Sequence, residues 1–248
     1  HTNDRRQRQM CIRDRLILVS LFTVTASIAD DHAGGPFGEG AFTTIMIQAN
    51  DTEKYIAALE SNTQIMENNG AIAGGYCETK SGHAYPGQMM VWTGYNSISD
   101  AFVASELYDP MAKPDRAFAK IREVKYAVTW KPLKPFKLDP GYERVMRVVV
   151  PPSSLMEFVS HMSSTEKALQ AAGHDMNAGV FQPIGGGSAE ANTVMVRFIA
   201  QNPEAFGKVL DDYYGGNDYG GHWEKGMALT TSIVTDNMEA CAQTYARD

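Results

Sequence analysis

The sequence predicts an α+β fold in which one β-α-β-β-α-β unit occurs twice. Strand and helix patterns follow each other in the same order in residues 42–132 and 142–236, and a proline-rich segment, residues 133–141, separates these ranges. With 44% apolar and 21% charged residues, the 248-residue chain has a globular composition. This composition excludes disordered, collagen-like and disulfide-scaffold proteins. The length allows either one large or two small domains.

The first copy opens with a strand that passes into a helix near Asn50. Asn50 can cap the first free amides of this helix, and Glu53, three residues later, can complete a capping box. Tyr55 and Leu59 lie on one apolar stripe, and Gly70 supplies the positive φ that ends the helix. The expected elements of this copy are strands at residues 43–48, 73–79, 88–93 and 124–131, a helix from Ser97, and a short helical piece that includes Phe118 and Ile121.

The second copy repeats this order. One helix begins at Ser154 and ends at Gly173, and another begins at Pro203 with Asn202 as its cap. Residues 237–248 are predicted to form a C-terminal tail. The alternative to an internal duplication is a chance similarity between two α+β modules. The strands of this copy are expected at residues 143–150, 177–182, 193–200 and 227–235.

A β-α-β-β-α-β order is that of the ferredoxin-like split βαβ unit. Its two helices cover one face of an antiparallel sheet and leave the other face open, so we expect the two sheets to pack together as an intramolecular pseudo-dimer. The chain thus resembles a fused, tandem form of the dimeric α/β-barrel superfamily, which includes antibiotic-biosynthesis-monooxygenase-like and stress-responsive barrel proteins. The resemblance implies activities that range from cofactor-free oxygenation, haem degradation or dechlorination and lactone isomerisation to no known catalysis.

The first 29 residues indicate export. Residues 1–15 are polar and Arg-rich and resemble translated adapter sequence, so we expect a non-native leader there. In residues 16–29, an uncharged run follows Arg13 and Arg15 and ends in small residues, which is typical of a signal peptide cleaved near Ala29. The run is shorter than the roughly 20 residues of a membrane helix. A buried core helix is the alternative. We expect a periplasmic or secreted protein.

The charge balance restricts the partners. Residues 1–29 hold five Arg and two Asp, so the remaining chain has 17 basic and 27 acidic residues and a net charge of −10. Nucleic acids and anionic membranes attract clustered Lys and Arg, so neither is an expected partner. No later segment is predicted to span a membrane. A small-molecule ligand and a further homo-oligomer remain as candidate partners. Cys77 and Cys241 pair only if the compartment is oxidising, and their spacing leaves this open.

The densest group of functional side chains lies in residues 211–223, DDYYGGNDYGGHW, which we interpret as a glycine-rich loop. Aromatic rings can stack on a flat apolar ligand, and an imidazole titrates near neutrality. His222 is therefore a candidate general base or, as an alternative, an axial haem ligand. The structural alternative is that the rings plug one end of the module and that His222 is an ordinary surface residue. The candidate ligand-binding residues are Tyr213, Tyr214, Tyr219, His222 and Trp223.

These observations give three hypotheses for the function and leave open whether the protein is an enzyme. The first is binding of a small apolar or aromatic ligand without a predicted cofactor. The second is a cofactor-free oxygenase or haem-handling enzyme that uses His222 and the neighbouring aromatic residues. The third is an envelope protein-interaction module. No structural metal site is predicted, because the histidines lack partners at ligand spacing. Cleavage after Ala29 would create one exception, an N-terminal Cu/Ni site at His32.

Overall fold

A computed structural model describes residues 37–112 and 120–247. The expected leader (residues 1–15), the expected signal peptide (residues 16–29) and His32 lie outside these ranges, and so does Phe118. Within the described part, the chain has six α-helices and eight strands, all antiparallel, which confirms an α+β fold. Gly34–Asp248 form one compact unit.

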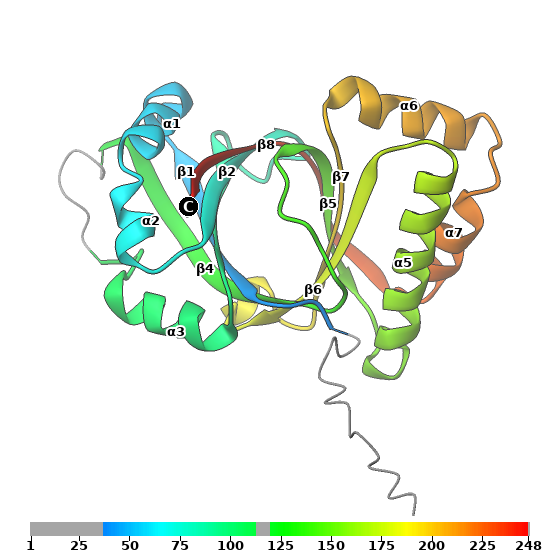
Figure 1. Cartoon of the computed structure of the whole chain (residues 1–248), viewed down its shortest axis with the longest axis horizontal. Coiled ribbons are helices and arrows are strands. Elements are labelled where there is room, and N and C mark those ends of the chain that lie inside the picture. Colours follow the sequence, from blue (N-terminus) through cyan, green and yellow to red (C-terminus); the bar gives the residue numbers. More distant parts are fainter. Residues whose placement is uncertain (1–36, 113–119, 248) are drawn as a thin grey trace, which may run out of the picture. The chain divides into compact units, whose positions relative to one another are not determined.

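The strands close into one barrel in the order β1-β3-β2-β8-β5-β7-β6-β4 (Figure 1). The first half of the chain contributes the run β4-β1-β3-β2 and the second half the run β8-β5-β7-β6, so two seams, β2–β8 and β4–β6, join the halves. The strands are β1 (Ala41–Ala49), β2 (Ala73–Ser81), β3 (Gln88–Tyr95), β4 (Arg122–Pro132), β5 (Gly141–Val149), β6 (Met176–Ile184), β7 (Val194–Ala200) and β8 (Ser232–Ala246).

This closure differs from the expected packing of one sheet on another. The four-stranded runs meet edge to edge, and their inner faces together enclose the interior of the barrel. An open sheet would leave unpaired N–H and C=O groups on its edge strands, and closing the barrel pairs them. At the β2–β8 seam, Cys77 lies opposite Cys241, and at the β4–β6 seam, Thr129 lies opposite Ile184.

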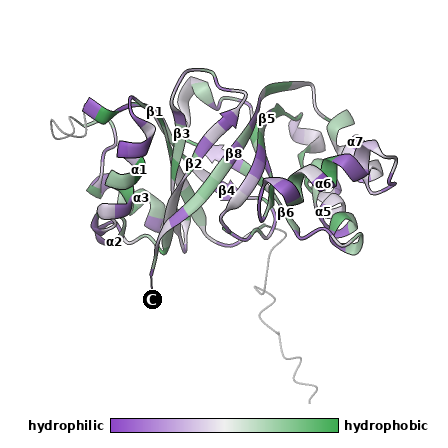
Figure 2. Cartoon of the chain, turned by 90° about the horizontal axis from the view of Figure 1, so that it is seen from above, coloured by the Kyte–Doolittle hydropathy of each residue, from purple (hydrophilic) through white to green (hydrophobic). Residues whose placement is uncertain are grey.

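The helices cover the outside of the barrel in two groups (Figures 1 and 2). Helices α1 to α3 lie on the strands of the first half, and α5 to α7 lie on those of the second half. No helix in the described ranges is long and apolar enough to cross a membrane. The helices are α1 (Thr52–Ser61), α2 (Gln64–Asn68), α3 (Ile98–Leu107), α5 (Leu155–Ala171), α6 (Pro203–Tyr214) and α7 (Gly220–Ala228).

Two of the predicted helix caps are present and one is displaced. Ser97 accepts a hydrogen bond from the amide of Asp100 at 3.0 Å, and Asn202 accepts one from the amide of Ala205 at 2.9 Å. The cap of α1 is Asp51 and not Asn50, because Asp51 Oδ1 accepts from the amide of Lys54. The predicted position was one residue early.

The segment expected to be a stiff linker is part of the second half. Leu133 and Lys134 are buried, and the amide of Leu133 donates to the carbonyl of Val180 at 2.8 Å. Lys134 Nζ donates to the carbonyl of Ala178 at 2.5 Å and pairs with Glu166 at 2.9 Å. The prolines therefore mark an ordered connection, fixed by a buried lysine, between two halves of one compact unit.

The C-terminal region differs most from its prediction. The expected loop at residues 211–223 is a helix-turn-helix, in which α6 ends at Tyr214 and α7 begins at Gly220. The expected final strand at residues 227–235 and the expected tail at residues 237–248 are likewise wrong, since β8 extends over Ser232–Ala246. Glycine has a low helix propensity, which hid α7, and the polar, half-exposed pattern of β8 hid the strand.

Candidate functional site

Two cavities lie in corresponding places of the two halves, each between the helices and the outer face of the barrel. The first cavity has a volume of about 270 Å³ and is bounded by β1, β3, β4 and helices α1 to α3. The second cavity has a volume of about 340 Å³ and is bounded by β5 to β8 and helices α5 to α7. The two cavities differ in chemistry, because the first is rich in hydroxyl groups and the second in aromatic rings.

Aromatic side chains from three elements form the second cavity. Phe198 on β7 and Trp223 on α7 meet edge to face, with ring centroids 5.5 Å apart. Tyr219, which precedes α7, is buried, and its hydroxyl donates to the carbonyl of Val209 on α6 at 2.6 Å. These contacts hold the rings in place, so the cavity has a preformed aromatic wall. The aromatic lining comprises Phe198, Phe206, Tyr213, Tyr214, Tyr219 and Trp223.

The polar groups of the second cavity are held by protein partners. Arg144 on β5 makes a bidentate ion pair with Asp236, with N–O distances of 2.7 and 2.6 Å. The guanidinium carbon also lies 5.9 Å from the centre of the Trp223 ring. The hydroxyl of Tyr213 donates to Glu224 Oε1 at 3.2 Å. Desolvation raises the pKa of Tyr213 and of Tyr219, so both present neutral phenols at physiological pH.

A histidine–aspartate pair supports this wall from behind. His174 Nε2 lies 3.0 Å from Asp212 Oδ2, and the imidazole meets the Tyr219 ring edge to face at 5.6 Å. His174 lies just after the end of α5, and its contact with Asp212 connects that point to α6. Neither His174 nor Asp212 lines the cavity. The pair therefore positions Tyr219.

The structure brings together four of the five residues predicted for ligand binding. Tyr213, Tyr214, Tyr219 and Trp223 all line the second cavity, although Tyr214 is 81% exposed and lies at its rim. His222 is exposed and is not among the lining residues. Its ring lies 5.9 Å from that of His161, on the outer surface of α5 and α7. The role of His222 stays a prediction.

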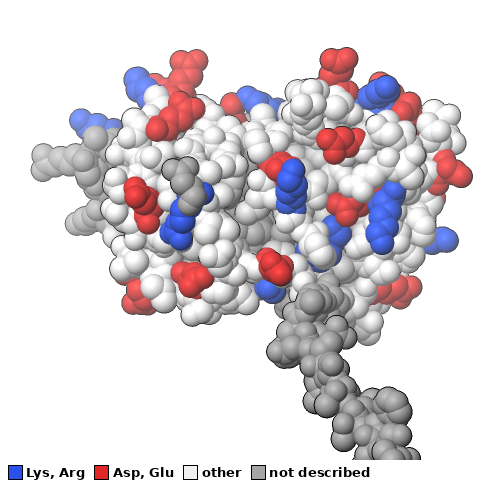
Figure 3. Space-filling view, in the orientation of Figure 1, with Lys and Arg blue, Asp and Glu red and all other residues white. Residues whose placement is uncertain are grey.

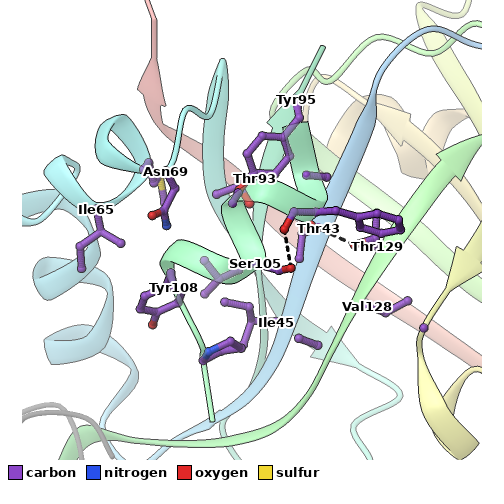
Figure 4. A pocket seen from close by; sticks show the side chains of 18 of the residues that line it. Thr43, Ile45, Ile65, Asn69, Thr93, Tyr95, Ser105, Tyr108, Val128 and Thr129 are labelled. Atoms are coloured by element: carbon purple, nitrogen blue, oxygen red, sulfur yellow. Dashed lines mark hydrogen bonds between the residues drawn. The ribbon is translucent and has the colours of Figure 1, made fainter. Parts of the chain in front are cut away.

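The first cavity was not predicted from the sequence. Three threonines, Thr129, Thr43 and Thr93, lie in register on the adjacent strands β4, β1 and β3 and form its floor (Figure 4). The hydroxyls of Thr43 and Thr129 are 3.3 Å apart. Tyr108 and Asn69 lie on the helical side of the cavity, opposite this row. The signal that could have found it is a threonine on the same face of three strands that pair.

Arg122 fixes one end of the first cavity. Its guanidinium donates to the hydroxyl of Tyr55 at 2.8 Å and to that of Tyr108 at 2.6 Å. Burial raises the pKa of Tyr55, so its hydroxyl remains protonated next to this cation. Arg122 thus holds Tyr108, which lines the first cavity.

The interior of the barrel holds a buried network of charged side chains. Arg197 on β7 pairs with Glu143 on β5 at 2.6 Å, and Arg147 on β5 pairs with Glu190 at 3.2 Å. Glu239 on β8 lies opposite Glu143 and is 1% exposed. Burial, with the negative charge of Glu143, raises the pKa of Glu239 to about 7. Alternate residues of a strand point to opposite faces, so the sequence shows that Glu143 and Arg147 share a face. It does not show that this face is the enclosed one.

Cys77 and Cys241 form a disulfide across the β2–β8 seam. The sequence left their pairing open, because 164 residues separate them. Barrel closure places them directly opposite each other on adjacent strands. The bond covalently joins the first half of the chain to the second.

Comparisons with known proteins identify the fold. No protein-family model matches the chain, and no curated protein matches it. Solved structures do match, among them an anthrone oxidase-like protein (10% identity, 85% of this chain and 97% of the other, TM-score 0.53). Two others are proposed monooxygenases, from Lactobacillus acidophilus (13%, 84% and 95%, 0.51) and Fusobacterium nucleatum (8%, 85% and 99%, 0.52). At these identities, the similarity establishes a shared α/β-barrel fold.

Proposed function

We propose that this protein binds a small apolar or aromatic molecule in the second cavity. The observation that carries the proposal is the wall of aromatic rings around a space of about 340 Å³. Ligand sites in proteins are concave and mostly apolar, with a few fixed polar groups and volumes of about 300–1,000 Å³. The second cavity has all three properties, since Arg144 and the tyrosine hydroxyls are its fixed polar groups.

The geometry favours a flat ligand with one polar edge. The rings of Phe198 and Trp223 provide faces for stacking, and Arg144 lies beside the same indole. Asp236 engages Nε and Nη2 of Arg144, and a guanidinium has five N–H donors in all. The remaining donors can meet a carbonyl or phenolic oxygen of the ligand. Acidic and basic side chains are interspersed on the face of the molecule in Figure 3.

The two halves of the barrel are best interpreted as ferredoxin-like modules fused into a pseudo-dimer. Three matches support this: equivalent strand orders, helices on the outer face of each half, and a cavity at the same place in each. A duplicated module explains why one cavity is aromatic and the other hydroxyl-rich, because two copies on one chain can diverge independently.

Oxidation of the bound aromatic molecule is the second candidate function. The solved structures that share the fold include an anthrone oxidase-like protein and proposed monooxygenases. His222 lies outside the cavity lining, which does include the phenols of Tyr213, Tyr214 and Tyr219. Dioxygen consumption in the presence of a hydroxylated polycyclic aromatic, lost in Tyr219→Phe, would support oxidation.

Haem does not fit the second cavity. Among the described residues that line it, there is neither an imidazole nor a thiolate, the commonest axial ligands of haem iron, and the hydroxyls of Tyr213 and Tyr219 are engaged by Glu224 and Val209. Its one cationic side chain, Arg144, is paired with Asp236, so the pair offers no net positive charge to a propionate. The nearby His174 is held by Asp212. Binding of an organic ligand without haem is therefore the function that these residues support best.

The disulfide supports the proposal that the protein acts outside the cytoplasm. Disulfides form and persist in oxidising compartments such as the periplasm and the extracellular space. The Cys77–Cys241 bond, together with the signal-peptide pattern of residues 16–29, is consistent with export. Fractionation of the native host, followed by mass spectrometry of the N-terminus, tests both the location and the cleavage near Ala29.

Titration with an uncharged polycyclic aromatic probe, followed by Trp fluorescence, tests the ligand-binding proposal. We expect Trp223→Leu to weaken probe binding about tenfold or more, which corresponds to about 1.4 kcal/mol. Tyr108→Leu, in the first cavity, is the matched control and should leave the affinity unchanged. Equal affinities in the wild type and in Trp223→Leu would contradict the proposal. Native mass spectrometry of protein from its natural host would identify a retained ligand.

A further inference from the structure

The disulfide lies within a cluster of potential metal ligands inside the barrel. The cluster consists of Cys77, Cys241 and the carboxylates of Glu143 and Glu239. One ligand atom from each of the four residues lies within 4.8 Å of all the others. Three strands that are consecutive in the barrel, β2, β8 and β5, carry them. In the oxidised protein, the sulfur atoms are bonded to each other, so the cluster lacks its thiolates.

Glu239 indicates that this cluster is built to receive another group. Its side chain is 1% exposed, and Thr79 Oγ1 donates to Oε1 at 3.4 Å. Among the described residues, Oε2 has no hydrogen-bond partner. Burying an oxygen without a hydrogen-bond partner costs free energy, and a bound ion would remove this cost. Glu143 contributes a second oxygen, since Oε1 lies 3.2 Å from Cys241 Sγ while Oε2 is held by Arg197.

The charges around the cluster also suit a cation. Three buried glutamates, Glu143, Glu190 and Glu239, share the interior with only two arginines, Arg147 and Arg197. Reduction adds two thiols, which bind zinc as thiolates, and Arg197 Nη2 lies 3.8 Å from both sulfurs. The interior then holds more negative than positive charge, which a divalent cation can neutralise.

We propose that reduction of the Cys77–Cys241 disulfide creates a buried zinc site whose ligands are Cys77, Cys241, Glu143 and Glu239. Zinc prefers four tetrahedral ligands, with about 2.3 Å to sulfur and 2.0–2.2 Å to oxygen, so its ligand atoms lie roughly 4 Å apart or less. All four ligand atoms already lie within 4.8 Å of one another, so once the sulfur–sulfur bond is broken, side-chain rotation has to separate the two sulfurs and bring the carboxylates slightly closer. The oxidised protein has no such site, so binding depends on the redox state.

The chemistry balances with a named reductant. A dithiol gives up two electrons and two protons, becomes a disulfide, and leaves two thiols on the protein. Zn²⁺ then replaces the thiol protons, which pass to solvent as two zinc–sulfur bonds form. In the laboratory, a water-soluble phosphine serves better, because it competes less for the metal. It becomes the phosphine oxide, and water supplies the oxygen and the two hydrogens of the thiols.

Cobalt is the spectroscopic probe for the test, because a tetrahedral thiolate complex of Co²⁺ has a characteristic absorption. The test uses the full chain with the substitution Cys11→Ser, so that Cys77 and Cys241 are its two cysteines. This variant is compared before and after reduction by the phosphine. We expect the reduced chain to bind one Co²⁺, which Zn²⁺ displaces, and the oxidised chain to bind none. Zn²⁺ should also raise the unfolding temperature of the reduced chain alone, which shows that the folded form binds it.

Two glutamine variants separate this site from adventitious binding by thiols. Glu239→Gln removes a ligand and should weaken Zn²⁺ binding to the reduced chain about tenfold or more. Glu190→Gln is the matched control, because Glu190 is an equally buried glutamate in the same barrel but outside the cluster, and its affinity should stay near that of the unmodified site. Equal cobalt binding in Glu239→Gln, or no binding to the reduced chain, would overturn the proposal.

Discussion

Inside the barrel, Arg197 Nη2 lies 2.6 Å from Glu143 Oε2, and both side chains are almost completely buried. Arg197 belongs to β7 and Glu143 to β5, so the pair connects neighbouring strands of the second half. A buried ion pair is costly to desolvate, and removing one partner leaves the other charge without compensation.

Arg197→Met should therefore destabilise the protein strongly. We expect a loss of about 3–5 kcal/mol in the free energy of unfolding, because Glu143 is left charged and buried. Urea unfolding monitored by circular dichroism measures this loss. The double variant Arg197→Met/Glu143→Leu should recover much of it. A double variant as unstable as the single one would contradict the explanation.

The contribution of Glu239 to the free energy of unfolding should fall as the pH rises from about 4.5 to about 7. Burial raises the pKa of Glu239 from 4.5 to about 7, so the folded state holds a proton that the unfolded state has already lost in this range. The contribution of Glu239 to stability is complete below the lower value and is lost as the pH rises through the higher one.

Glu239→Gln provides the comparison for this pH dependence, since its neutral amide does not titrate. The difference in unfolding free energy between the wild type and Glu239→Gln, measured in urea from pH 4 to pH 8, should change steadily between about 4.5 and about 7. Thr79, Glu143, Arg147 and Arg197 surround the carboxyl and are unchanged in both proteins. A constant difference over this range would show that Glu239 does not titrate there.

Two adjacent glycines of α7 allow a matched test of the second cavity. A Cβ at Gly220 would collide with the ring of Tyr213, whereas a Cβ at Gly221 would meet nothing within 4 Å. Gly220→Ala should therefore displace Tyr213 and weaken binding of the aromatic probe. Gly221→Ala should leave binding unchanged and raise the unfolding free energy by about 0.5–1 kcal/mol, because alanine favours a helix. Equal effects of both variants on affinity would argue against Tyr213 as part of the site.

Haem added to the purified protein should give no Soret shift that depends on His222. That imidazole is exposed and lies beside His161, outside the second cavity. Absorption spectra of haem with the wild type and with His222→Ala should therefore coincide. A Soret shift in the wild type that is lost in His222→Ala would instead support haem binding at the outer surface of α7.

The elements that depend on local signals could be predicted from the sequence. Ser97 and Asn202 cap their helices as expected, and seven of the eight expected strands are present at their predicted places. Helix α7 could not be predicted because Gly220, Gly221 and Gly226 oppose a helix. Only packing explains it, since Gly226 fits against Met162 and His161 of α5, where a side chain would collide.

The candidate site shows the same division between local and long-range information. Tyr213, Tyr219 and Trp223 could be proposed because they cluster in one stretch of sequence. The floor of the first cavity could not be proposed, since Thr43, Thr93 and Thr129 come from three strands that are far apart in the sequence. The same holds for the ionic interior and the disulfide, which depend on the closure of the barrel.

The pairing of β8 with both β2 and β5 has a consequence for biosynthesis. The strand β8, which closes the barrel, follows all the other described strands in the sequence, so β2 has no neighbour on one side until β8 has been made. A chain that stops at residue 236 would lack most of this strand and expose the edges of β2 and β5 to other molecules. Such a truncated product would be prone to aggregate through its unpaired strand edges.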